Sequence, residues 1–94
     1  MFTDFVGPPL GEDTINILFY FHTGIKQTMF ANSNILFMDL IDIFYKRNAN
    51  LYNIFNIVFL FNGKIIDNYM NLSLTQIGFQ DGSHIEVIDI ENII

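Results

Sequence analysis

The chain has 94 residues and a mass of 10.9 kDa, the size of one domain with a hydrophobic core of its own. Ten acidic and four basic residues give a net charge of −6, so few cations are available to neutralise phosphates and we expect no nucleic-acid partner. The absence of cysteine excludes disulfides and thiolate metal sites. The hydrophobic fraction, 51%, is high for so small a chain and favours burial of apolar surface against another protein.

The sequence offers no segment for membrane insertion or secretion. Its longest apolar stretches, such as residues 57–61, are far shorter than the roughly 18 residues that cross a bilayer. The first residues lack the basic region and continuous apolar run of a signal peptide. We therefore expect a cytoplasmic or nuclear protein that is not secreted, with organellar import left open.

Residues 1–13 contain both prolines and two of the six glycines and have no hydrophobic periodicity. We expect a flexible N-terminal tail here, with Pro8-Pro9 favouring an extended conformation. The alternative is that the apolar residues of this segment dock on the domain or on a partner. The folded domain is then expected to cover residues 14–94.

The first half of this domain predicts two strands and a helix. Alternating apolar residues over 15–21 indicate a strand, and His22-Thr23-Gly24 indicates a reversal into a second strand over 25–31. Residues 32–34 (Asn-Ser-Asn) are candidate N-caps for a helix that begins near Ile35. Placing residues 35–47 at 100° steps predicts the inward positions of this helix, which are Phe37, Leu40, Ile41 and Phe44.

The second half predicts three further strands. Residues 57–61 form an apolar run, and the Asn62-Gly63 pair that follows it is a strong hairpin signal leading to a short strand over 64–66. An irregular stretch and a turn at Asp81-Gly82 come next. The last strand is expected from His84 to about Ile90.

This order predicts an α+β fold of the β-grasp type, in which a mixed sheet of four to five strands carries one helix packed across one face. The chain resembles ubiquitin and the small ubiquitin-like modifiers over residues 14–94. Three segments carry the resemblance: Thr23-Gly24, residues 59–64 (FLFNGK) and residues 74–87 (LTQIGFQDGSHIEV).

The resemblance also indicates where conjugation chemistry would lie. Family members that become attached to lysines end in Gly-Gly, because a bare extended backbone must thread a narrow channel of the activating enzyme. Ile93-Ile94 stand at those positions, so we expect a non-conjugated protein. Lys64 matches a chain-linkage lysine of ubiquitin, but an exposed lysine after a turn is ordinary.

No group of residues predicts catalysis. His22 and His84 have no third ligand at a recognisable metal-binding spacing. Ser83 and His84 are strand neighbours whose side chains point to opposite faces, so they cannot act as nucleophile and base. We expect no enzymatic activity, no metal, no cofactor and no small-molecule substrate.

The candidate site is the sheet face turned away from the helix. Residues alternate across a strand, so the outward set follows from the inward anchors Ile17, Phe19, Phe59, Phe61, Ile85 and Val87. The apolar outward residues form a predicted protein-binding surface: Leu18, Tyr20, Val58, Leu60, Ile88 and Ile90.

The resemblance places two of the three positions of ubiquitin's receptor-binding patch on Leu60 and Ile88, and the third on His22. The alternative is that the N-terminal tail or the loop around Phe55 covers this face within the same chain. Two further expectations concern the helix: Phe44 should meet Phe61 in the core, and the outward residues Met38 and Tyr45 indicate a second contact.

These observations predict a scaffold or accessory subunit of a stable multiprotein complex, whose partners are the other protein subunits. One alternative is a soluble adaptor that mimics ubiquitin and binds ubiquitin receptors reversibly through Leu60 and Ile88. The other is a modifier activated by an unusual route.

Overall fold

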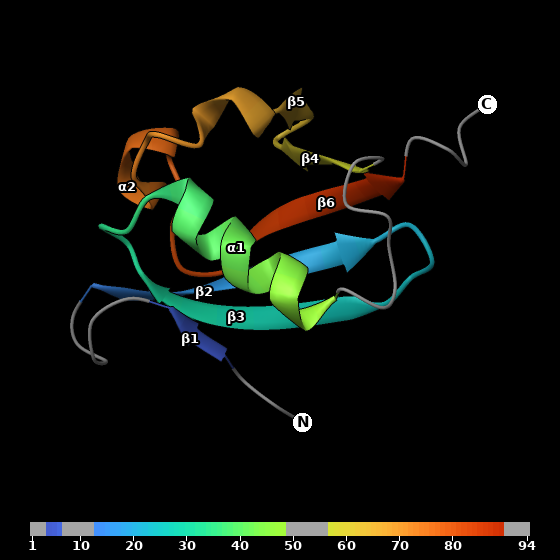
Figure 1. The fold of residues 1–94 in the computed structure, drawn as a ribbon, viewed down its shortest axis with the longest axis horizontal. Helices are drawn as coiled ribbons and strands as arrows, with labels where there is room; N and C mark the ends of the chain where they lie inside the picture. Colours follow the sequence, from blue (N-terminus) through green and yellow to red (C-terminus); the bar gives the residue numbers. More distant parts are fainter. Residues whose placement is uncertain (1–3, 7–12, 49–56, 90–94) are drawn as a thin grey trace.

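The computed structural model describes residues 4–6, 13–48 and 57–89, which form one mixed sheet with a helix across one face (Figure 1). The strands lie in the order β1-β3-β2-β6-β4-β5, and β6 runs parallel to β2 in the middle of the sheet. The strands are β1 (Asp4–Val6), β2 (Thr14–Phe21), β3 (Lys26–Asn32), β4 (Ile57–Phe61), β5 (Lys64–Ile65) and β6 (Ser83–Asp89). The helices are α1 (Phe37–Arg47), the 3-10 turn η2 (Asp67–Tyr69) and α2 (Leu74–Ile77).

The predicted α+β β-grasp architecture is confirmed, with one strand more than the predicted four to five. The additional strand, β1, lies within the segment for which we predicted a flexible tail, and it pairs in parallel with Met29–Ala31 of β3. Pairing is available there because the outer edge of β3 would otherwise present unpaired backbone N–H and C=O groups. The rest of the predicted tail, residues 1–3 and 7–12, lies outside the described residues, and the domain boundary at residue 14 stays a prediction.

The hairpin signals in the sequence are confirmed. Asn62 and Gly63 both have positive φ, at 54° and 76°, as a two-residue type I′ turn requires. The turn joins Phe61 to Lys64, which are paired across β4 and β5. Gly24, at φ 94°, occupies a left-handed position in the turn between β2 and β3.

The start of α1 differs from the prediction. The N-cap residue is Leu36, and it makes no side-chain capping bond. The first N–H groups of the helix instead donate to backbone carbonyls of a distant segment: Phe37 N–H to the Leu72 oxygen at 2.8 Å and Met38 N–H to the Met70 oxygen at 3.1 Å. No capping side chain is needed, because these carbonyls satisfy donors that a helix terminus leaves open.

The stretch expected to be irregular contains the short helix α2. The Ser73 side chain accepts from the Gln76 N–H at 3.1 Å, and the Gln76 side chain accepts from the Ser73 N–H at 2.8 Å. This capping box fixes the first turn, and Gly78, at φ 107°, ends the helix in the left-handed region.

Aromatic side chains dominate the core between α1 and the sheet. The Phe44 ring stacks on Phe19 at 4.6 Å and meets the edge of Phe59 at 5.3 Å. The expected meeting of Phe44 and Phe61 is wrong: Phe61 lies at the end of β4, only partly buried, and its ring packs 4.3 Å from Phe79. The predicted helix phase is confirmed, since all four inward residues are buried: Phe37, Leu40, Ile41 and Phe44.

Candidate protein-binding surface

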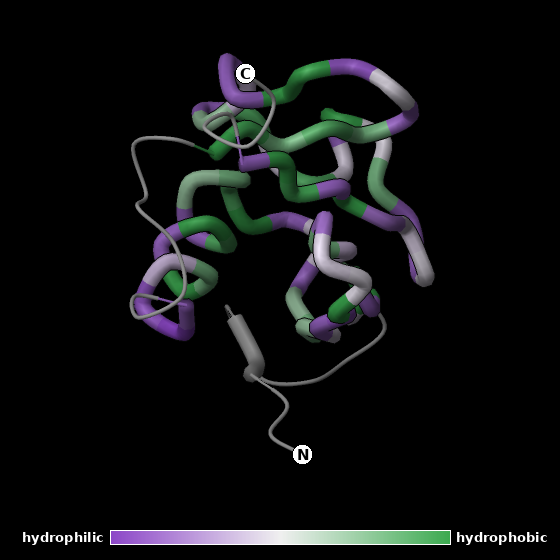
Figure 2. The backbone as a smooth tube through the Cα atoms, turned by 90° about the vertical axis from the view of Figure 1, so that its right-hand side faces the viewer, coloured by the Kyte–Doolittle hydropathy of each residue, from purple (hydrophilic) through white to green (hydrophobic). Residues whose placement is uncertain are grey.

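The outer face is the sheet surface turned away from α1, and strand alternation defines it. Ile17, Phe19 and Phe21 of β2 are buried beneath the helix, so Leu18 and Tyr20 between them face outward. Burial alternates in the same way along β4 and β6, which brings the other described members of the predicted surface to this face: Val58, Leu60 and Ile88. Figure 2 shows hydrophobic and hydrophilic positions interspersed along the backbone.

Strand register arranges these side chains in rows. Leu60 lies beside Glu86 and Val58 beside Ile88, across the β4–β6 pair. All five described surface residues are partly buried. Partial burial is expected because neighbouring side chains on one face of a sheet contact one another. Ile90, the sixth predicted member, lies outside the described residues.

The longest row crosses five strands. Tyr20 lies beside Lys26 on one side and Glu86 on the other, and Leu60 continues the row to Ile65 on β5. Ile65 is 54% exposed, one of the most exposed large apolar side chains described. The row therefore combines apolar surface with one carboxylate near its middle.

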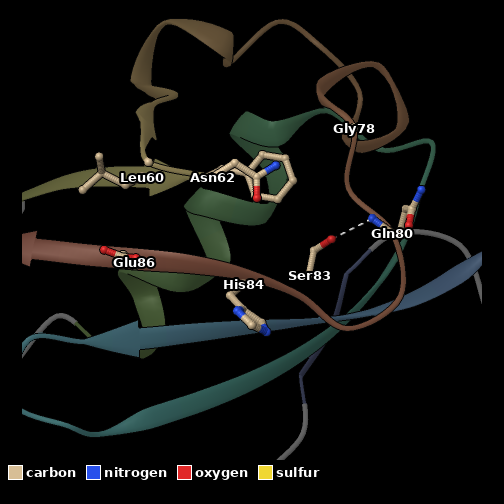
Figure 3. Close-up of a pocket in the computed structure, with 9 residues that line it drawn as sticks. Leu60, Asn62, Gly78, Gln80, Ser83, His84 and Glu86 are labelled. Carbon is tan, nitrogen blue, oxygen red and sulfur yellow. Dashed lines mark hydrogen bonds between the residues drawn. The ribbon is translucent and has the colours of Figure 1, made fainter.

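Tyr20 is held in place by its neighbours. The Lys26 ammonium nitrogen lies 5.3 Å from the centre of the Tyr20 ring, within the range of a cation–π contact. On the other side, the His84 ring meets the Tyr20 ring at 4.9 Å, edge to face. Figure 3 shows the His84 side chain extending from β6 toward β2. His84 is thus a member of the outer face.

An open hollow of about 450 Å³ adjoins Leu60, between the end of β4 and the start of β6 (Figure 3). A hydrogen bond stabilises the turn that lines one side of this hollow: the Gln80 N–H donates to the Ser83 hydroxyl at 2.8 Å. The Glu86 carboxylate at its margin makes no ion pair or side-chain hydrogen bond among the described residues. The hollow can receive a polar or cationic side chain next to the apolar row.

Sequence reasoning missed two apolar members of the outer face, Phe30 and Ile65. Phe30 lies beside Asn16 in the β2–β3 pair, and it is partly buried. Side chains alternate along the predicted strand over 25–31, so residues 26, 28 and 30 share one face, and this pattern would have placed Phe30 on it. Ile65 could have been placed from the hairpin, because a two-residue turn fixes the register that sets it beside Leu60.

The helix side offers less apolar surface than predicted. Met38 is 44% exposed, as expected. Tyr45 is instead partly buried and packs against the core, with its ring centre 6.0 Å from the ring centre of Phe59. Burial raises the pKa of the Tyr45 hydroxyl, and the nearby Asp67 carboxylate raises it further.

Two further features are absent from the described residues, a metal-binding cluster and a membrane-spanning helix. Within residues 4–6, 13–48 and 57–89, no cluster of three or more histidine or carboxylate side chains could hold a metal ion. In the same part of the chain, no helix has the length and apolar character that crossing a membrane requires. His22 is exposed in the first hairpin turn, on a different element from Leu60 and Ile88.

No protein-family model and no curated protein sequence matches the chain. Solved structures do match. The ubiquitin-like domain of Plasmodium falciparum Dsk2 is 25% identical, with a TM-score of 0.66, and the alignment covers 81% of this chain and 97% of that one. The ubiquitin-like domain of yeast Ddi1 has a TM-score of 0.73 at 13% identity and 86% and 94% coverage. A protein designed on a ubiquitin template is 26% identical, with a TM-score of 0.62 and coverage of 82% and 90%.

The chain has the ubiquitin-like β-grasp fold. The alignments span nearly the whole length of both natural neighbours, so the match concerns the complete β-grasp and not a shared hairpin. Ubiquitin-like domains of this fold are typically protein-interaction modules.

Proposed function

We propose that this ubiquitin-like domain is a scaffold or accessory subunit of a stable multiprotein complex, held by its outer face. The observation that carries the proposal is the row from Tyr20 through Glu86 and Leu60 to Ile65, with Val58 and Ile88 alongside. Apolar side chains gathered on one face beside polar groups are typical of interaction sites. Stable subunit interfaces are more apolar than transient ones, which favours the complex over a signalling encounter.

Scarcity of charge supports the same reading. Only 15% of the residues are charged, so few long polar side chains are available to shield the outer face within one chain. Near the middle of the row stands the Glu86 carboxylate, with no ion pair among the described residues. A complementary partner would place a cationic side chain over the Glu86 carboxylate and apolar side chains over Leu60.

The proposed role does not involve conjugation. Ile93-Ile94 occupy the positions at which conjugated relatives carry Gly-Gly, and the six glycines of the sequence include no adjacent pair. A Cβ at either position obstructs the narrow passage that a bare backbone can thread.

A second candidate is an adaptor that mimics ubiquitin and binds its receptors reversibly. The observation that favours it is the placement of Leu60 and Ile88, which match two positions of ubiquitin's receptor-binding patch and both face outward. Affinity for receptors would then be weak and would depend on the same apolar contacts.

Native affinity purification of the full chain, followed by mass spectrometry, separates the two. The complex predicts a fixed, stoichiometric set of partners that survives a wash in high salt, because apolar interfaces are little affected by screening. Recovery of ubiquitin receptors alone, in substoichiometric and variable amounts, would favour the adaptor. A chain that purifies alone under both conditions would contradict both.

A further inference from the structure

The outer edge of β3 is closed by a very short strand. Asp4, Phe5 and Val6 pair in parallel with Met29, Phe30 and Ala31, and no other strand is described on that edge. A pairing of three residues adds little to stability, and such short terminal elements open far more readily than the core of a sheet. β3, by contrast, is anchored along its other edge by seven paired residues of β2. The edge therefore persists when β1 leaves it.

β1 and β2 lie on opposite edges of β3. Val6 is paired with Ala31 on one side of β3, and Thr14 is paired with Asn32 on the other side. The gap is two strand spacings, about 10 Å, and residues 7–13 can span about 23 Å when extended. The length is sufficient to close within one chain, and equally sufficient to reach the β3 edge of an adjoining copy.

We propose that the N-terminal strand exchanges between copies: the Asp4–Val6 segment of one chain pairs with the β3 edge of a second, and reciprocal exchange gives a symmetric dimer. The occupant is the second copy because an identical segment fits the edge by construction, with the same parallel register. An exposed strand edge is a template for such pairing, and exchange of an identical element is a low-cost route to dimers. The exchange uses the edge of the sheet opposite β5 and is independent of the outer-face interface proposed above.

Concentration sets when exchange occurs. Pairing within one chain competes with exchange at an effective concentration on the order of millimolar, which is typical of two segments joined by a short connection. The dimer should therefore accumulate as the protein approaches about 1 mM.

The lack of cysteine in the sequence makes the test direct. Phe5→Cys, labelled with ¹⁵N, is mixed at about 1 mM with unlabelled Phe30→Cys under mild oxidation, and mass spectrometry without reductant counts mixed dimers. Phe5 and Phe30 are register partners, so their Cα atoms are close enough to bridge only when the strand of one copy lies on the edge of the other. The matched control replaces Phe30→Cys with Thr28→Cys, which lies two residues along the same strand and too far away to bridge.

Exchange predicts at least about ten times more mixed dimer from the register pair than from the control, as expected when pairing raises local concentration. Equal yields would mean random collision and would overturn the proposal. A doubly substituted chain, Phe5→Cys with Phe30→Cys, that bridges only within monomers at 1 mM would also overturn it, because the edge would then be closed in each chain. Bridging in neither form would show another occupant on the edge, and would equally overturn it.

A second register pair guards against a folding defect in Phe30→Cys. The second register pair is Val6→Cys with Ala31→Cys, which adds only one sulfur atom at the buried Ala31, and Asp4→Cys with Ala31→Cys is its out-of-register control. Leu60→Asp, introduced into the first pair, should leave the yield of mixed dimer unchanged. A fall in that yield to the control level would show that the copies associate through the outer face instead.

Discussion

The side-chain amides of Gln27 and Asn48 form a reciprocal pair that joins β3 to the end of α1. Gln27 Nε2 donates to Asn48 Oδ1 at 2.8 Å, and Asn48 Nδ2 donates to Gln27 Oε1 at 3.0 Å. Asn48 Nδ2 also donates to the Phe44 carbonyl at 2.8 Å. Asn48 is only 2% exposed, and burial of its amide is tolerated because its polar atoms have partners.

We expect Asn48→Ala to lower the free energy of unfolding by about 1 to 3 kcal/mol, because it leaves the Gln27 amide without its partner and removes one of the two hydrogen bonds to the Phe44 carbonyl. Urea denaturation followed by circular dichroism measures the loss. Asn34→Ala is the matched control, since the Asn34 side chain is exposed and donates only a long 3.4 Å bond to Asp13. Equal effects of the two substitutions would contradict a structural role for the amide pair.

Phe44→Ala should be the more damaging of two aromatic truncations. Phe44 is fully buried among Phe19, Phe21 and Phe59, so its removal should cost about 3 to 5 kcal/mol. Phe61→Ala should cost clearly less, because that ring is partly exposed at the end of β4. Thermal unfolding of both variants ranks them, and the reverse order would mean that the described core is wrong.

Leu60→Asp tests the outer face with a charge instead of a cavity. Water can solvate the new carboxylate in the isolated protein, so circular dichroism should show a normal fold. Burying it against a partner without a counter-charge would cost several kcal/mol, and each 1.4 kcal/mol weakens binding about tenfold. Co-purification of partners should therefore be lost.

Met38→Asp is the control for that experiment, because it places the same charge on the exposed helix side of the molecule. Retention of every partner by a folded Leu60→Asp variant would rule out the outer face as the binding surface. Failure of Leu60→Asp to fold would instead show that the chain itself covers this face.

Gly63→Ala should destabilise the β4–β5 hairpin through the backbone alone. No atom lies within 4 Å of the Cβ that the substitution adds, but φ is +76°, where a side chain costs about 1 to 2 kcal/mol. Asn62→Gly is the control, since glycine also adopts the φ of 54° found there and should change stability little. Denaturant midpoints of the two variants measure the difference; a neutral Gly63→Ala would contradict the type I′ turn.

Stability should fall at high pH in a way that depends on Tyr45. Burial raises the pKa of this hydroxyl above its usual value of about 10, so the unfolded chain loses the proton first as pH rises. The contribution is fully present below pH 10 and is lost as pH rises from there through the folded pKa. Tyr45→Phe should lose less stability between pH 9 and pH 11 than the unsubstituted chain, as measured by urea denaturation. Identical losses would contradict the burial of the hydroxyl.

Local signals in the sequence were sufficient for α1 and for the five strands from β2 to β6. The inward positions of α1 followed from its hydrophobic period, because helix geometry repeats regardless of context. The Asn62-Gly63 turn was predicted equally well, since positive φ at both positions is a property of those two residues. Alternation likewise placed Leu18, Leu60 and Ile88 on a common face.

Contacts between distant segments were beyond such reasoning. The sequence suggested side-chain caps near Asn34 for α1, but its first N–H groups bond to the Leu72 and Met70 carbonyls, which only folding brings there. β1 could not be predicted for the same reason. The pairing of Asp4–Val6 depends on the available edge of β3, and the Asp4–Val6 sequence has no strand pattern. Asn48 is a buried polar residue whose side chain is bonded both to Gln27, a distant residue in the chain, and to the Phe44 carbonyl.

The sequence by itself determined the fold class, the buried face of α1 and the strands that present Leu60, because these depend on periodicities set by backbone geometry. The tertiary structure decided which residues meet: that Phe44 stacks on Phe19 and not on Phe61, that Ile65 extends the row of Leu60, and that β3 carries a sixth strand. Those outcomes depend on register, strand order and available edges, which are properties of the whole sheet and which no local pattern contains.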